Sequence, residues 1–337
     1  MHGSTGHAGR TGRTALAVAA ALVLACAPSA PPPAGSPALP SAAPAAADWS
    51  PDRLGEAYAA NRAAAAHAAG AAGRAGDGER AAALRALAAP DRTLLEFDPR
   101  GQGRAVEAVG DLERAERVAV LVPGADTTLT TFDGHGARPY ARVGDAAREL
   151  QERMRARDPE TPTAVVAWMG YEAPATVSAA VATTARADEG AAALEAFVPR
   201  LVRAAPGARL SLVCHSYGAV VCGRAHAAAA RAGAVVLVGS PGAGVDRAAD
   251  IGAGGRVWAG RADADWIGGV PHGSLPLPGT GAEAGFGPDP VGAGFGAEVF
   301  DAGPGGHSDY FAPGSVPLAA MARIVLDGGA GEGDGRA

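Results

Sequence analysis

The stretch LVCHSYGAVV, residues 212–221, decides the fold, because an apolar strand runs directly into a helical pattern through one turn. Ser216 lies at that turn, in the sequence CHSYG. This sequence matches the nucleophile elbow GxSxG except that Cys214 replaces the first glycine. The elbow needs small residues two positions before and after the serine, since the strand and helix backbones approach closely there. Cysteine is small and Gly218 meets the second requirement, so Ser216 is a candidate nucleophile rather than only a helix cap.

Strand-like and helical patterns alternate around this elbow. The apolar runs do not alternate with polar residues, which is typical of strands buried on both faces of a parallel sheet. Together they predict a doubly wound, mostly parallel sheet with helices on both faces. The predicted strands are a hairpin of TLLEF and RAVEAV flanking DPRGQG, then 117–122, 163–168, 209–214, 234–239, 256–260 and 297–302. The predicted helices are 143–154, 193–202 and 316–326.

Two features qualify these helical predictions. Pro199 is expected to kink or shorten the helix over 193–202, because proline removes a backbone donor from a helix interior. An alanine-rich segment over 49–90 predicts two short helices before the main domain, with breaks at Gly70, Gly73 and around Gly76.

Composition excludes several chemistries. The chain has 337 residues, 48% of them hydrophobic, and a formal net charge of −6. It contains no lysine, so all 29 basic residues are arginine, and a GK[ST] phosphate loop, a Schiff-base lysine and a Ser/Lys dyad are impossible. The mild acidity and the lack of a basic run argue against a nucleic-acid partner. No HExxH or paired CxxC is present, so we expect neither a metal nor another cofactor.

The N-terminus has the features of an export signal. Arg10 and Arg13 precede an apolar run over 14–25, which is too short for the roughly 20 residues of a membrane-spanning helix but suits a signal peptide. VLAC, ending at Cys26, resembles a bacterial lipobox, in which the cysteine carries a lipid anchor. We therefore expect either an outward-facing cell-membrane lipoprotein or a freely secreted protein.

The sequence as a whole predicts five segments, of which only the main domain is large. A signal peptide precedes a linker whose proline, alanine and serine content prevents folding. The oligomeric state is not indicated by the sequence. The predicted segments are a signal peptide over 1–25, a Pro/Ala-rich linker over 26–48, the helical segment over 49–90, the main domain over 91–327 and a flexible tail over 328–337.

An elbow serine requires a histidine base, and in this architecture the chain order is serine, acid, histidine. His215 neighbours the serine, but its side chain is expected to point away from the hydroxyl. His307 follows the last predicted strand, where the fold places the base, and His272 is the second choice. The remaining histidines are His2, His7, His67, His135 and His226, which lie before the serine or on the following helix.

The acid and the oxyanion donors have candidates at two other strand ends. The acid should follow the strand over 256–260, where RADADWI offers Asp263 and Asp265, of which we prefer Asp265. The amide after the nucleophile, that of Tyr217, is one expected oxyanion donor. Ala125, in the sequence PGADTT after the strand over 117–122, is expected to supply the other.

Several phrases together resemble one family. VPGADTTL, VAWMGYEAP, CHSYG, VLVGSPG, DADWI and GGHSDYF, which occur in order between about residues 92 and 325, are similar to an actinobacterial α/β-hydrolase family of unassigned physiological role. The resemblance implies an α/β-hydrolase fold and a serine hydrolase with Ser216, His307 and an aspartate at 265 or 263. It does not supply a substrate.

Two further expectations concern the cysteines and a long loop. Cys214 and Cys222 flank the elbow and form either a disulfide or a pair of buried thiols. The loop over 268–296 is long enough for a lid or a substrate wall. Trp266, just before this loop, and Phe286 and Phe295 within it are the candidates to line an acyl or alcohol pocket.

The sequence thus predicts an exported serine hydrolase, most similar to a carboxylesterase or lipase, that acts on a small-molecule or lipid-like acyl substrate through an acyl-enzyme. The alternative is a non-catalytic binding or scaffold protein of the same fold at the cell surface. A scaffold has no need of nucleophile, acid, base and oxyanion loop together, so their presence favours the enzyme.

Overall fold

A computed structural model describes residues 49–134, 136–276 and 283–327. The predicted signal peptide, the linker, Cys26, His135 and the C-terminal tail lie outside these residues. Within the described ranges, no helix combines the length and the apolarity that a membrane crossing requires.

An eight-stranded sheet forms the centre of the molecule, with the strand order β1-β2-β4-β3-β5-β6-β7-β10. The first two strands form the predicted antiparallel hairpin, β2 runs antiparallel to β4, and all other neighbours are parallel. The predicted doubly wound sheet is therefore confirmed. The strands are β1 Leu94–Asp98, β2 Arg104–Gly110, β3 Arg117–Val122, β4 Thr163–Met169, β5 Arg209–His215, β6 Ala234–Val238, β7 Arg256–Gly260 and β10 Glu298–Val299, with a separate hairpin of β8 Gly273–Pro276 and β9 Glu283–Gly287.

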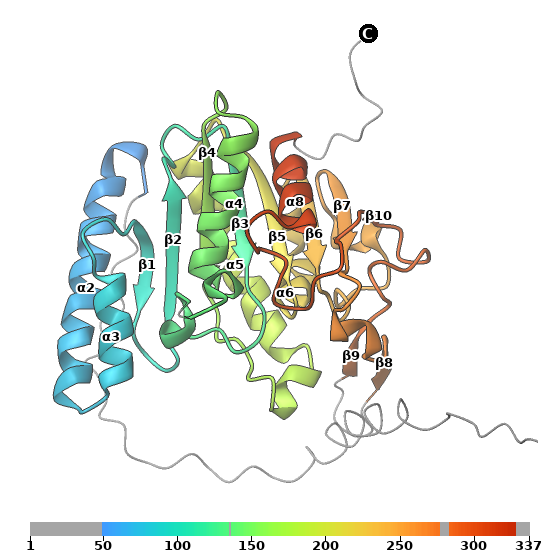
Figure 1. Ribbon diagram of the computed structural model, residues 1–337, viewed down its shortest axis with the longest axis horizontal. Helices are drawn as coiled ribbons and strands as arrows, with labels where there is room; N and C mark the ends of the chain where they lie inside the picture. The colour runs from blue at the N-terminus through green and yellow to red at the C-terminus, as the bar shows by residue number, and fades with distance from the viewer. Residues whose placement is uncertain (1–48, 135, 277–282, 328–337) are drawn as a thin grey trace, which may run out of the picture.

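Helices cover both faces of the sheet, as Figure 1 shows. In β3, Val118, Val120 and Val122 belong to the core beneath α5 and α6, whereas Ala119 and Leu121 belong to the core beneath α4 and α8. This alternation explains the unbroken apolar runs, since both faces of each central strand are buried. The helices are α2 Leu54–Arg74, α3 Gly78–Leu87, α4 Val143–Arg157, α5 Ala185–Ala204, α6 Gly218–Arg224, α7 His226–Ala229 and α8 Val316–Asp327.

The N-terminal helix α2 packs against the edge strand β1, and α3 packs against α2 (Figure 1). The Asn61 side-chain amide donates to the carbonyl oxygens of Leu94 and Leu95, each at 2.9 Å. Trp49 lies in the same core as α5, in edge-to-face contact with Phe197. This segment thus shares its core with the sheet.

Three details of the predicted elements are wrong. Helix α5 continues through Pro199 to Ala204, because the buried Val198 and Leu201 hold both sides of the proline against the core. Helix α2 is long and passes through Gly70 and Gly73, so the only break lies at 75–77. The strand predicted over 297–302 is reduced to β10 Glu298–Val299, after which the chain leaves the sheet edge towards the glycines that precede His307.

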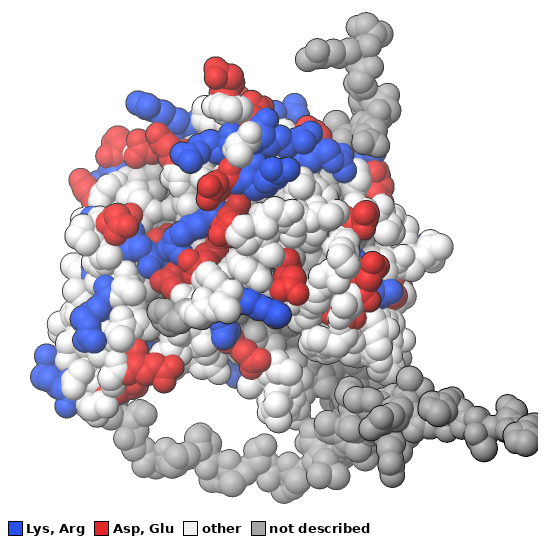
Figure 2. All heavy atoms as spheres, viewed as in Figure 1, with Lys and Arg blue, Asp and Glu red and all other residues white. Residues whose placement is uncertain are grey.

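Charged side chains of both signs are interspersed on the face shown in Figure 2, with arginine gathered towards one end. Some charged side chains of both signs also pair below the surface. Arg92 is buried and binds Glu107 of β2 and Asp133. Arg148 of α4 binds the same two carboxylates, with distances of 3.2 and 3.0 Å. These ion pairs join α4 to β2 of the hairpin. They also give each buried charge in the cluster an opposite partner, which offsets the cost of burying it.

Of the two alternatives for the cysteines, the structure has the disulfide: Cys214, at the end of β5, is bonded to Cys222 of α6. Their Cα atoms are 6.5 Å apart, and both side chains are fully buried. The bridge closes a short loop that contains Ser216, so it joins strand and helix across the elbow.

We expect replacement of both cysteines by alanine to lower the free energy of unfolding by about 2.5 kcal/mol, the loop-closure entropy for a separation of this length. Denaturant unfolding without reductant, monitored by far-UV circular dichroism, measures this difference. Thiol titration of denatured wild type before reduction is the control, and detection of two free thiols beyond any contributed by Cys26 would show that the bridge is absent.

Candidate active site

The elbow forces Ser216 into an unusual backbone conformation. Its φ is +57°, in the left-handed region that residues with a Cβ rarely adopt. A Cβ on Gly218 would overlap the carbonyl oxygens of Val122 and Pro123, so α6 approaches β3 too closely for any side chain there. The Ser216 amide donates to Val238 O at 3.0 Å, which ties the turn to β6. These contacts hold the hydroxyl at the carboxyl end of β5.

The structure brings Ser216, His307 and Asp265 together in the predicted order. His307 Nε2 lies 2.9 Å from Ser216 Oγ, and His307 Nδ1 lies 2.9 and 3.0 Å from the two carboxylate oxygens of Asp265. Of the two candidate acids, it is therefore Asp265 that contacts the histidine. With Nδ1 donating to the carboxylate, Nε2 is free to accept the serine proton.

Asp265 accepts more hydrogen bonds than the sequence indicated. Tyr310 Oη donates to Oδ2 at 2.6 Å and the Ile267 amide donates to Oδ1 at 2.9 Å, in addition to His307. Burial alone would raise the pKa of Asp265, but these three donors together lower it below its ordinary value. The Tyr310 hydroxyl is itself fixed, because it accepts the Ala262 amide at 3.0 Å. Asp265 is thus held ionised and in one orientation.

Asp263, the other candidate, takes no part in this arrangement. Its amide donates to Gly303 O at 2.9 Å, and it lines a cavity of about 360 Å³ with Arg261, Val299 and Asp265. The remaining lining residues of that cavity are Ala262, Val291 and Phe300.

His215 supports the base from the protein interior. Its Nε2 lies 2.9 Å from the carbonyl oxygen of His307, and the two rings lie 4.9 Å apart. Burial, together with the neighbouring His307, lowers the pKa of His215 to about 3. A neutral imidazole with its proton on Nε2 donates to that carbonyl. As expected, His215 does not reach the Ser216 hydroxyl, but it does position the segment that carries His307.

The two expected oxyanion amides belong to Tyr217, which follows Ser216, and to Ala125 in the loop after β3. A Cβ on Gly124, beside Ala125, would come within 2.6 Å of Ser216 Cβ, so this loop touches the nucleophile. Within the described part of the chain, neither the Ala125 nor the Tyr217 amide has a hydrogen-bond acceptor. Two unpaired donors beside a serine are what an oxyanion site requires.

Neighbouring segments fix the loop after β3, which is the expected oxyanion loop. Asp126, with a φ of +61°, accepts the Thr176 amide at 2.8 Å and its hydroxyl at 2.5 Å. The buried Tyr171 hydroxyl donates to Pro123 O at 2.9 Å. Asp126 and Ser216 are the two non-glycine residues with positive φ among those described, and both lie at this site.

The other predicted pocket residues separate in the structure. Phe295 is buried in the core, and Phe286 packs edge-to-face on Tyr217 with ring centroids 5.5 Å apart. Trp266 alone lies against His307, at 4.7 Å between ring centroids. His272, the second candidate base, has Nε2 3.8 Å from Asp289 Oδ1 and does not contact the serine.

Sequence reasoning missed three contributors to the site. Tyr310 lies three residues after His307 in GGHSDYF, and Asp126 lies in PGADTT after β3. The sequence therefore contains both residues in phrases that carry site candidates, but it assigns neither of them a role. Gly239 begins the loop after β6 with a φ of +58°, and a Cβ there would lie 2.9 Å from the Tyr310 ring and 3.0 Å from Asp265 Oδ2. The signal for Gly239 is the glycine that ends the apolar run AVVLVG.

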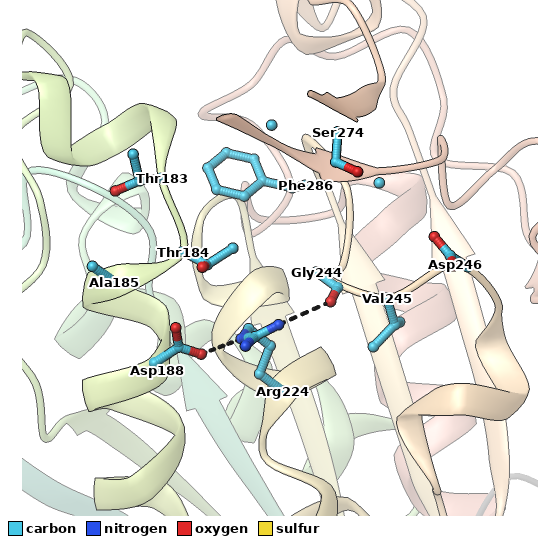
Figure 3. A pocket seen from close by; sticks show the side chains of 12 residues that line it. Thr183, Thr184, Ala185, Asp188, Arg224, Gly244, Val245, Asp246, Ser274 and Phe286 are labelled. Atoms are coloured by element: carbon cyan, nitrogen blue, oxygen red, sulfur yellow. Dashed lines mark hydrogen bonds and ion pairs between the residues drawn. The ribbon is translucent and has the colours of Figure 1, made fainter. Parts of the chain in front are cut away.

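A larger cavity of about 520 Å³ lies beside this centre, where α5, α6 and the β8–β9 hairpin meet (Figure 3). Arg224 at the end of α6 binds Asp188 and Gly244 O on its wall, and Phe286 forms part of its lining. Ser216, His307 and Asp265 are not among the lining residues, so the cavity is separate from them. Among the described residues, no group of three or more His, Cys, Asp or Glu could hold a metal ion.

Comparisons with known proteins identify similar sequences in mycobacteria. Uncharacterized protein Rv2079 of Mycobacterium tuberculosis is 34% identical over 274 residues, which is 72% of this chain and 39% of the relative. Uncharacterized protein Mb0988c of Mycobacterium bovis is 31% identical over 186 residues, which is 52% of this chain and 69% of the relative. The chain thus spans about two fifths of the length of the first of these relatives.

A solved structure from Xanthomonas campestris, XC6422, described as an α/β serine hydrolase without lid, is 16% identical with a TM-score of 0.41 and covers 71% of this chain and 94% of that chain.

The parallel sheet with a serine at the strand-to-helix turn after β5 defines an α/β-hydrolase fold. A family model described as alpha/beta hydrolase matches residues 98–274, more than half of the chain. The chain therefore belongs to this alpha/beta hydrolase family, and its membership favours a hydrolase.

The displaced pKa of His215 predicts a pH dependence of stability. Below the ordinary histidine value of about 6.5, the unfolded state takes up a proton that the folded state does not accept until about pH 3. The free energy of unfolding should therefore fall as the pH is lowered through this window, by at most about 1.4 kcal/mol per pH unit for this one group. Because His215 as a whole residue is only partly buried, we expect a smaller slope than this limit.

Denaturant unfolding of wild type and His215→Gln between pH 4 and pH 7 measures this contribution. Glutamine keeps a side-chain donor without the titration, so the variant should show the flatter slope. Equal slopes would show that His215 takes up its proton equally well in both states.

Proposed function

We propose that the protein is a serine hydrolase that cleaves an ester-like acyl substrate through an acyl-enzyme, as a carboxylesterase or lipase does. The observation that carries this proposal is the continuous hydrogen-bonded chain from Ser216 Oγ through His307 to Asp265. In this proposal Ser216 is the nucleophile, His307 is the general base and then acid, and Asp265 orients the imidazole.

Acylation would begin when Ser216 Oγ attacks the ester carbonyl carbon and its proton moves to His307 Nε2. The carbonyl oxygen becomes negative and is stabilised by the amides of Tyr217 and Ala125. The imidazolium is stabilised by Asp265, whose lowered pKa keeps it ionised. The bond to the alcohol oxygen then breaks, and the proton on Nε2 passes to that oxygen, which leaves as a free alcohol.

Deacylation repeats these steps with water. His307 Nε2 takes a proton from a water molecule as its oxygen attacks the acyl carbon, and the same amides hold the new oxyanion. The proton then returns to Ser216 Oγ as the acyl–oxygen bond breaks, and a carboxylic acid leaves. No other reactant is needed.

Labelling by a fluorophosphonate probe tests the three roles, because the probe phosphonylates only an activated serine. We expect wild type to be labelled and Ser216→Ala to be unlabelled. His307→Ala should react at least about 100-fold more slowly than wild type, the usual loss when a general base is removed. Asp265→Asn should also react slowly. In-gel fluorescence against time measures these rates.

Asp263→Asn is the matched control, because it removes a carboxylate two residues from Asp265 that does not contact His307. Its labelling rate should equal that of wild type. Labelling that persists in Ser216→Ala would contradict the nucleophile, and a folded wild type that is never labelled would favour the binding or scaffold protein.

We also propose that the protein is exported. The disulfide between Cys214 and Cys222 supports this, because such bonds persist in oxidising compartments and are rare in the cytosol. The lipobox-like VLAC sequence adds an anchor at Cys26.

Cell fractionation of a bacterium that expresses the full chain tests export and anchoring separately. We expect wild type in the membrane fraction and Cys26→Ala in the medium or periplasm, because the variant cannot be lipidated. Wild type found in the medium would favour free secretion, and wild type found in the cytosol would contradict export.

A further inference from the structure

Trp266 is a large apolar side chain at the entrance to the proposed site. It follows Asp265 directly and remains 56% exposed. Its ring centroid lies 4.7 Å from that of His307, with 48° between the ring planes. The His307 side chain is only 14% exposed, and the indole of Trp266 is one of the groups that pack against it.

The orientation of His307 does not require this indole. Asp265 holds Nδ1 with both carboxylate oxygens, and His215 binds the His307 carbonyl from the interior. These contacts already fix the ring plane and the backbone of the base. The half-exposed Trp266 is therefore available to contact a substrate.

The chemistry of the base determines which part of the substrate lies beside Trp266. In acylation, the proton on His307 Nε2 passes to the alcohol oxygen, which must come within hydrogen-bond distance of Nε2. The first carbons of the alcohol then lie beside the imidazole and against the indole. The carbonyl oxygen is held elsewhere, at the amides of Ala125 and Tyr217.

We propose that Trp266 forms an alcohol-side subsite that favours esters whose alcohol presents an apolar surface, such as an aryl or a long alkyl group. This inference rests on the proposed function, because it requires Ser216 and His307 to perform the acyl transfer. An aromatic face that covers such a group would raise kcat/KM about tenfold over an ester with a minimal alcohol.

The test uses the full chain and three esters of one acid, namely methyl, hexyl and phenyl butyrate. The ratio of variant to wild-type kcat/KM cancels the different intrinsic reactivities of the esters. For Trp266→Ala we expect this ratio to be about tenfold lower with the hexyl and phenyl esters than with the methyl ester. Trp266→Phe should recover most of the loss, because it keeps an aromatic face.

Two measurements separate this subsite from a structural role. All three esters give the same butyryl-enzyme, so the deacylation rate after a pre-steady-state burst should be unchanged in Trp266→Ala. Leu275→Ala is the control, since it removes an apolar side chain on β8 that is 72% exposed, and it should affect the three esters equally.

The possible outcomes distinguish failure of the subsite from failure of the proposed function. An equal loss for all three esters would overturn the subsite and show that Trp266 only positions His307. A loss that follows acyl length, seen with methyl acetate and methyl hexanoate, would overturn it by placing Trp266 on the acyl side. If a folded wild type hydrolyses none of the esters, the proposed function fails and the subsite fails with it.

Discussion

The site depends on the tight turn at Ser216. A left-handed conformation at a residue with a Cβ costs on the order of 1–3 kcal/mol, and it persists only where the surrounding structure imposes it. Here Gly218 allows α6 to approach β3, the Ser216 amide is bound by Val238 O, and the Cys214–Cys222 bridge joins the two sides of the turn. The cysteine that departs from the usual glycine therefore fits the turn and also locks it.

The segment that carries His307 is fixed by groups from separate strand ends. Asp265 follows β7, Gly239 follows β6 and His215 ends β5, and all three meet His307 or Tyr310. Hydrogen bonds to ionised groups are stronger than neutral ones in a poorly solvated site. The three donors to Asp265 thus offset the cost of burying its charge and keep the acid in one orientation.

Local patterns predicted most of the fold, while tertiary contacts decided the rest. The strands and the elbow follow from apolar runs and small residues, which are properties of short segments. The choice of Asp265 over Asp263 could not follow from spacing, because it depends on which carboxylate meets a histidine more than 40 residues later. The predicted kink or end of the helix at Pro199 is wrong for a related reason. Core packing on both sides of the proline outweighs its local preference against a helix interior. The contacts of Tyr310 and His215 likewise exist only after folding.

The second strained residue, Asp126, shows how the two halves of the proposed oxyanion site are related. Asp126 has a positive φ and binds Thr176, so the loop after β3 is held by the loop after β4, independently of the elbow. The Tyr217 amide is fixed by the turn, and the Ala125 amide is fixed by this second clamp. Donors that are already oriented need no reorganisation when charge develops on the substrate oxygen, which is where electrostatic catalysis gains most. The positive φ values of Ser216 and Asp126 thus lie in the two turns that would carry the proposed oxyanion amides.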